Sequence, residues 1–180
     1  MSFSKFTAGA VVALAVCLFS APSVSAAGAC SGAAATASRA SERVLVRATL
    51  CVLNEVRARH HLRPLQLNSK LSTAATRHSR AMVRREFFSH DSLDGTSFVD
   101  RIRATGYLSG ARDWYVGENI AYGSGDRSSP RSIRGAWMKS PPHRANILRS
   151  SFREIGIGLA LGTPVDVDGA TYTTDFGKRS

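Results

Sequence analysis

Apolar side chains recur every three or four positions in residues 41–60, which is the spacing of one face of an α-helix. Pro64 interrupts this pattern because proline disfavours helical geometry at the residue before it. The same spacing returns in residues 68–85, where Asn68 or Ser69 can cap the first turn and arginines occupy the opposite face. The pattern therefore predicts two amphipathic helices.

Further helical segments lie in the middle of the chain. Residues 97–105 are typical of a short helix that Gly106 ends. The stretch "GENIAYGSGDRSSP" is rich in glycine and serine, so we predict that it is mostly irregular. Ser129 followed by Pro130 then marks the start of another helix, which Pro141 ends.

The C-terminal segment changes to the period of a β-strand. Residues 154–161 place Ile155, Ile157, Leu159 and Leu161 on one face, and "ATYTTDFG" is a second strand-like run. The turn-like "GTPVDVDG" between them predicts an antiparallel hairpin. Helices followed by a hairpin predict an α+β fold in which helices pack on a small antiparallel sheet.

The N-terminus has the pattern of a secretory signal peptide over residues 1–26. Lys5 precedes the apolar run "TAGAVVALAVCLFSA", and the small residues of "SVSA" allow cleavage after Ala26. A retained N-terminal anchor or lipid attachment at Cys30 are the alternatives. We expect an exported protein without a transmembrane anchor after processing, with a leader over residues 27–43 and one domain over residues 44–180.

The cysteines fit an exported chain. Of the three, Cys17 lies in the predicted signal peptide, which leaves Cys30 and Cys51. An even pair outside the cytosol predicts a disulfide that ties the start of the mature chain to the first helix. Two free thiols are the alternative.

The chain is strongly basic. Its 24 lysine and arginine residues outnumber 13 aspartate and glutamate residues, and the net charge is +11. The arginines are scattered rather than gathered in a tail. Outside the cell, lipid headgroups and anionic envelope polymers suit this charge better than nucleic acid does. A solvated basic surface without a dedicated partner is the alternative.

Three ionisable side chains stand in or beside irregular segments flanked by apolar residues. They are His90 in "FFSH", Glu118 in "GENIA" and His143 in "SPPH". Loops held by a scaffold are where binding residues concentrate, so we treat these three as the candidate site. His78 lies instead on the apolar face of the second helix, which is the usual position of a buried core histidine.

These segments resemble the CAP superfamily of cysteine-rich secretory proteins, antigen five and plant pathogenesis-related proteins. They are most similar to its bacterial SCP-like extracellular branch. The motifs "FSH", "GENIAYG", "SPPHRANIL", "IGIGLA" and "YTTDFG" follow a similar opening helix pair in the family's order and spacing. The resemblance covers residues 50–176 and implies a three-layer α-β-α sandwich around an antiparallel sheet.

The resemblance also implies a cavity with two histidines and two acidic residues. His90 and His143 match the histidines, and Glu118 matches the first acid. The second acid falls three residues after Trp137, where this chain has Ser140, so the set is incomplete. Two neutral imidazoles can bind a divalent metal such as zinc, which makes His90 and His143 the predicted ligands. A buried polar tie between His90 and Glu118, bordered by His143, is the alternative.

The family includes lipid binders and toxins, so the resemblance implies the fold more strongly than the function. We expect a secreted, monomeric binding protein rather than an enzyme, with a lipid or an anionic envelope component as its ligand. The alternative is a cell-envelope hydrolase that cleaves peptidoglycan or peptide with His90, Glu118 and His143. Ser140 and His143 can also meet across the Pro-Pro turn, but no segment marks an oxyanion hole.

Overall fold

The computed structural model describes residues 30–180, so the predicted signal peptide and residues 27–29 of the predicted leader lie outside it. The helices predicted over residues 41–60, 68–85 and 97–105 are all present. The elements in chain order are α1 (Glu42–Arg59), β1 (Gln66–Leu67), α2 (Ser69–Arg84), α3 (Phe98–Ala104), β2 (Trp114–Ser124), the short 3-10 helix η1 (Gly125–Ser128), α4 (Pro130–Lys139), α5 (Pro141–Leu148), β3 (Glu154–Leu161) and β4 (Gly169–Arg179).

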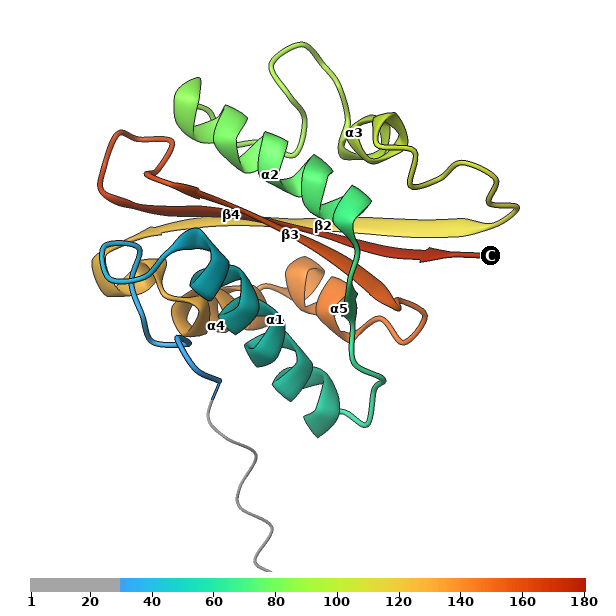
Figure 1. Ribbon diagram of the computed structural model, residues 1–180, viewed down its shortest axis with the longest axis horizontal. Helices are drawn as coiled ribbons and strands as arrows, with labels where there is room; N and C mark the ends of the chain where they lie inside the picture. The colour runs from blue at the N-terminus through green and yellow to red at the C-terminus, as the bar shows by residue number, and fades with distance from the viewer. Residues whose placement is uncertain (1–29) are drawn as a thin grey trace, which may run out of the picture.

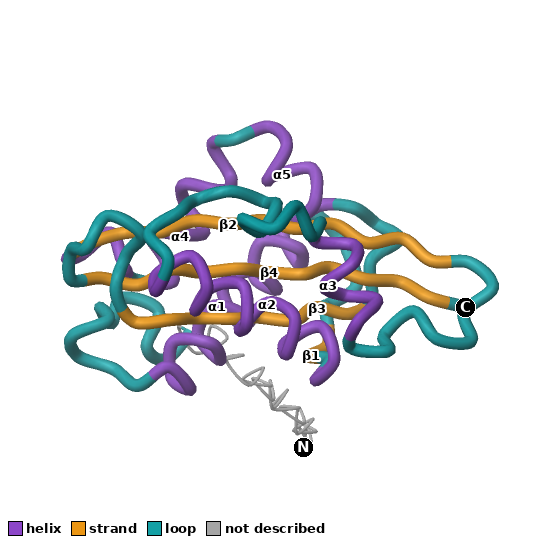
Figure 2. Tube along the Cα trace, turned by 90° about the horizontal axis from the view of Figure 1, so that it is seen from above, coloured by secondary structure: helices purple, strands orange, loops and turns teal. Residues whose placement is uncertain are grey.

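The sheet lies between two layers of helices. α2 and α3 cover one face, and α1, α4 and α5 cover the other (Figure 1). The strand order is β1-β3-β4-β2, which can be followed across the sheet in Figure 2. β3 and β2 both pair antiparallel with β4, whereas the two-residue β1 pairs parallel with β3. The predicted three-layer α+β fold is confirmed, with the correction that β1 makes the sheet mixed rather than purely antiparallel.

The segment predicted to be irregular is a long strand, so that prediction was wrong. β2 spans 11 residues and pairs with β4 along its whole length. Its glycines serve close packing, because a Cβ at Gly123 would lie 2.3 Å from the Arg127 carbonyl oxygen. A Cβ at Gly117 would likewise lie 2.8 Å from Asn146 Oδ1. Glycine inside a strand often marks such an approach, which composition alone does not distinguish from a loop.

A buried arginine holds α5 against α1. Arg57 is fully buried, and burial together with the charge of Arg153 lowers the pKa of its guanidinium. It donates four hydrogen bonds to backbone carbonyls, at distances of 2.7 to 3.3 Å; the acceptors are Arg63, Ile147, Arg149 and Phe152. Two of these carbonyls lie at the C-terminal end of α5, where the last helical turn leaves its carbonyls unpaired. Arg57 therefore fixes the helix that carries His143.

The predicted disulfide between Cys30 and Cys51 is confirmed. The bridge joins the segment before α1 to α1 across a Cα–Cα distance of 5.6 Å. It packs in a small buried cluster with Ala33 and Val52. Closing a loop of this length contributes roughly 3 kcal/mol in the chain-entropy model. Among residues 30–180, no helix has both the length and the apolar character needed to cross a membrane.

Candidate functional site

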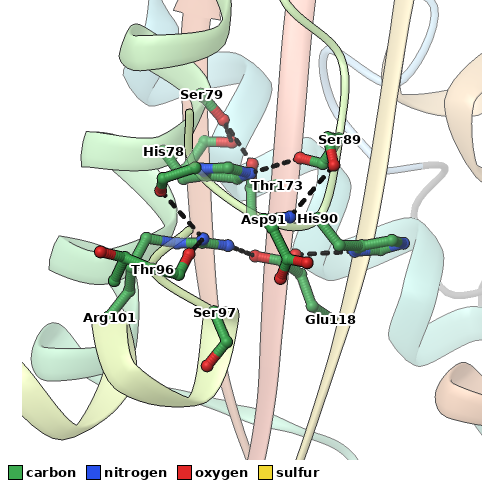
Figure 3. A network of polar contacts seen from close by, with 12 residues as sticks. His78, Ser79, Ser89, His90, Asp91, Thr96, Ser97, Arg101, Glu118 and Thr173 are labelled. Atoms are coloured by element: carbon green, nitrogen blue, oxygen red, sulfur yellow. Dashed lines mark hydrogen bonds and ion pairs between the residues drawn. The ribbon is translucent and has the colours of Figure 1, made fainter. Parts of the chain in front are cut away.

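The structure brings two of the three candidate residues into direct contact. His90 Nδ1 lies 2.7 Å from Glu118 Oε1 (Figure 3). Glu118 stands on the edge strand β2 and its side chain is only 1% exposed, whereas the side chain of His90, in the loop after α2, is 48% exposed. A carboxylate only accepts hydrogen bonds, so the imidazole donates from Nδ1 and keeps Nε2 for solvent or a ligand.

A cation from the helical layer holds the other oxygen of this carboxylate. Arg101, on α3, places Nη2 at 2.7 Å from Glu118 Oε2, with 11% of its side chain exposed. Its Nη1 donates to Ser92 Oγ and to the Thr96 carbonyl, which fixes the guanidinium. Sequence reasoning missed Arg101, because nothing distinguishes it from the many other arginines of the chain. Glu118 is therefore paired on both oxygens.

His78 supports the loop that carries His90. Its side chain is buried on α2, as predicted, and Nε2 lies 2.8 Å from the carbonyl of Ser89. A carbonyl accepts only, so Nε2 carries the proton. Burial is the main cause that lowers the pKa of His78, and the nearby charge of Glu118 acts in the opposite direction. The neutral imidazole thus anchors the residue directly before His90.

The third candidate, His143, makes a different contact. It lies on α5, and its Nδ1 is 2.9 Å from Ser140 Oγ. Burial, and secondarily the charge of His90, lower the pKa of His143, so its imidazole is neutral at pH 7. Among residues 30–180, no carboxylate forms an ion pair with His143. The structure thus pairs His90 with Glu118 and pairs His143 with Ser140, the position at which the resemblance implied a second acid.

Two asparagines connect these two halves of the site. Asn119 Nδ2 donates to the His143 carbonyl at 3.1 Å, and Asn146 Nδ2 donates to the Glu118 carbonyl at 3.1 Å. The two side chains also bond to each other at 2.9 Å. These bonds attach α5 to the outer edge of β2, and the bond from Asn146 occupies a backbone carbonyl, that of Glu118, on this edge strand.

A second carboxyl group, which the sequence motifs did not indicate, lies beside Glu118. Asp175 of β4 is the direct cross-strand partner of Glu118. It is 1% exposed, and its Oδ1 has no hydrogen-bond partner within residues 30–180. Burial, and then the charge of Glu118, raise the pKa of Asp175 well above its usual range, against a smaller opposite effect of Arg101. Only the register of β2 against β4, which the sequence does not specify, could have revealed this pair.

The residues present suit a metal only in part. Both predicted ligands, His90 and His143, use Nδ1 within the protein and leave Nε2 for a ligand. Within residues 30–180, the one cluster of three ligand-type side chains within 4.8 Å consists of Glu55, Cys30 and Cys51, whose sulfurs form the disulfide. Zinc on the two histidines would have two protein ligands, fewer than the three or four usual in proteins. The metal site stays a prediction.

A groove of about 440 Å³ lies between Tyr122 of β2 and α4. Its lining residues are Tyr122, Arg127, Ser132, Ile133, Gly135, Ala136 and Lys139. Tyr122 is also in edge-to-face contact with Phe88, at 5.0 Å between ring centroids, and both rings are partly exposed. Phe88 precedes His90 by two residues, so an apolar surface leads from the histidine to the groove.

The three-layer fold, with imidazole and carboxylate groups at the edge of its sheet, is the arrangement of a CAP domain. The chain belongs to the CAP family, described as the cysteine-rich secretory protein family, whose model matches residues 50–174. It is 35% identical over 105 residues to the uncharacterized protein YkwD of Bacillus subtilis, covering 58% of this chain and 38% of that protein. It is 32% identical over 130 residues to the uncharacterized membrane protein YlbC of the same species, covering 72% of this chain and 33% of that protein. The chain thus spans 33% to 38% of the length of these curated relatives.

Solved structures share the fold. An extracellular protein containing an SCP domain from Bacillus anthracis superposes with a TM-score of 0.61 at 26% identity, over 76% of this chain and 43% of that one. An outer surface protein of Borrelia burgdorferi gives a TM-score of 0.58 at 22% identity, over 73% of this chain and 90% of that one. The bacterial CAP assignment therefore rests on both sequence and fold.

Proposed function

We propose that this protein is exported and binds an anionic amphiphile of the cell envelope, a lipid with a negatively charged headgroup, without converting it chemically. Its similarity to an extracellular SCP-domain protein supports export. The observation that carries the binding proposal is the composition of the groove between β2 and α4.

The groove combines an apolar floor with a positive rim. Tyr122 and Ala136 provide exposed surface for a hydrocarbon chain above the buried Ile133, and Arg127 and Lys139 provide two cations. No acidic residue is among the groove's lining residues in the described part of the chain. A ligand that is apolar over most of its length and anionic at one end matches this arrangement, because concave sites are mostly apolar with a few polar groups that fix orientation.

The neighbouring site also favours binding over turnover. Glu118 is paired with His90 and Arg101, so its carboxylate is not free to take a proton from water or substrate. General base catalysis needs such a free, positioned acceptor. The half-exposed His90 imidazole can instead offer Nε2 to a polar headgroup at the end of the groove.

The test is calorimetric titration of the purified chain with lyso-phosphatidylglycerol and with lyso-phosphatidylcholine, each below its micelle-forming concentration. We expect the anionic lipid to bind more tightly, and Lys139→Glu to weaken its binding about tenfold, because a charge reversal near the surface changes the interaction by about 1–2 kcal/mol. Arg77→Glu, on the exposed face of α2, makes the same change in net charge away from the groove. Equal affinity for the two lipids, or equal loss in the two variants, would contradict the proposal.

The contact between Ser140 and His143 favours a second candidate, an envelope hydrolase. The neutral imidazole could accept the serine proton. However, Pro141 and Pro142 occupy the first turn of α5 and supply no N–H for an oxyanion. An activity assay decides between the two candidate functions. Wild type, Ser140→Ala and His143→Ala are each incubated with peptidoglycan and with casein, with and without chelator. Product that either substitution abolishes establishes the hydrolase, and no product from any of the three rules it out for these substrates.

A further inference from the structure

Within residues 30–180, the buried layer around Glu118 contains two carboxyl groups and a single arginine. Glu118 and Asp175 face each other directly across β2 and β4, and each side chain is almost completely buried. Directly opposed residues of antiparallel strands have Cβ atoms about 5 Å apart on the same face of the sheet. The groups that face this pair are Arg101 from α3, His78 from α2 and His90 from the loop. On β3, the residue opposite Asp175 is a glycine without a side chain.

Arg101 is therefore the one permanently charged cation among the described groups that face the two carboxyl groups of Glu118 and Asp175. Arg101 directs Nη2 to Glu118, and the ordered proton of His78 is used by the Ser89 carbonyl. No N–H or O–H group of residues 30–180 reaches Asp175 Oδ1. An ionised carboxylate needs donors when it is buried, and a like charge directly opposite disfavours it further. A carboxylic acid, in contrast, brings its own proton and can donate it.

We propose that Asp175 is a positioning residue that remains protonated at neutral pH and donates a hydrogen bond to the Glu118 carboxylate. Glu118 then accepts from three directions: from His90 on Oε1, from Arg101 on Oε2 and from Asp175. The pair carries one negative charge, which Arg101 balances. This bond fixes the carboxylate and, through it, the orientation in which His90 presents Nε2. The burial and like charge that raise the pKa of Asp175 act in the same direction. The inference does not depend on which ligand the groove binds.

The direct test is a carbon-13 NMR pH titration of the aspartate carboxyl groups in the intact chain. We expect the Asp175 signal to keep the protonated position from pH 4.5 to pH 7.5, with the signals of the exposed Asp166 and Asp168 recorded in the same spectra as controls. An Asp175 signal that titrates together with these two controls overturns the proposal.

The positioning role has its own readout in the proton on His90 Nδ1. Asp175→Asn keeps an N–H donor toward Glu118, so we expect the low-field His90 Nδ1 proton signal to remain. Asp175→Leu has no donor, so that signal should be lost to solvent exchange, while the Trp137 indole proton on the opposite layer stays protected. A His90 signal that persists in the leucine variant refutes the positioning role.

The pH dependence of the free energy of unfolding provides a further test, which needs only wild type and Asp175→Asn. A carboxyl group with a raised folded pKa stabilises most below the unfolded value of about 3.9, and this contribution is lost as pH rises toward the folded pKa. Asp175→Asn does not lose stability in this way, because an asparagine side chain does not ionise. The ratio of its folding equilibrium constant to that of wild type should therefore grow between pH 4.5 and pH 7.5, by up to about tenfold per pH unit. A ratio that does not change with pH contradicts a protonated Asp175.

Discussion

Replacement of Arg57 by leucine removes the group that attaches α5 to α1. The guanidinium is fully buried; within residues 30–180 it has no acidic partner, and all of its hydrogen bonds go to backbone carbonyls. Leucine fills part of the volume but donates nothing. Lysine keeps the charge, but its single ammonium group cannot reach carbonyls that lie on separate segments of the chain.

The cost follows from the carbonyls left without a donor. Those of Ile147 and Phe152 are buried, at 2.7 and 3.3 Å from the guanidinium, and the other two are partly buried. An unpaired buried group costs about 1–3 kcal/mol, and water can reach the partly buried ones at lower cost. We therefore expect Arg57→Leu to lower the free energy of unfolding by about 3–6 kcal/mol, a large fraction of the 5–15 kcal/mol typical of a domain.

Urea unfolding followed by circular dichroism measures this change. Arg59→Leu is the matched control, because Arg59 lies in the last turn of the same helix but is exposed. We expect the control to stay within about 0.5 kcal/mol of wild type, and Arg57→Lys to lie closer to Arg57→Leu than to wild type. A loss below about 1 kcal/mol in Arg57→Leu would refute the view that this residue anchors α5.

Three further predictions concern other parts of the chain. Because burial lowers the pKa of His78, its neutral imidazole stabilises the folded state fully above the unfolded histidine pKa of about 6.5, and this contribution is lost as pH falls. The urea midpoint of wild type should therefore fall between pH 7 and pH 5, and His78→Gln should make this decline smaller. Replacing Cys30 and Cys51 together with serine should cost roughly 3 kcal/mol in the same assay, and an unchanged midpoint would argue against a stabilising bridge. Zinc that binds His90 and His143 should raise the melting temperature, by an amount that corresponds to about 2.7 kcal/mol when free zinc is in hundredfold excess over its Kd. His143→Ala should abolish this increase. An equal increase in that variant would place any bound zinc elsewhere.

Local sequence signals predicted α1, α2, α3 and α4 well, but Pro141, expected only to end a helix, also begins α5. Asn68 caps α2 by accepting from two backbone N–H groups of its first turn, and Ser97 caps α3 in the same way with one. These caps, and the apolar spacing that follows them, act within a few residues and are therefore readable in the chain. The extended conformation of β2 is different, because its glycines are explained by packing. Gly123 packs against η1, which follows β2 directly, and Gly117 packs against Asn146 of α5, which is distant in the sequence.

The candidate site was predictable only where a motif marked it. His90, Glu118 and His143 stood in recognisable segments, and two of them are in contact. Arg101 and Asp175 belong to a helix and a strand whose sequences fit ordinary amphipathic elements. Their place beside Glu118 depends on strand register and on the packing of α3 against the sheet. Register is determined by pairing across the whole sheet, so one strand's sequence does not contain it.

Gly135 offers a direct test of whether the groove between β2 and α4 binds an anionic amphiphile. A Cβ at this position meets nothing within 4 Å, so a larger side chain enters the groove without displacing the protein. Alanine and leucine should both leave the fold intact, since glycine is a poor helix former. The measurement is the affinity of lyso-phosphatidylglycerol for Gly135→Leu relative to Gly135→Ala. We predict that the alanine variant binds as wild type does and that the leucine variant loses at least tenfold in affinity; equal affinities in a folded pair would contradict the account.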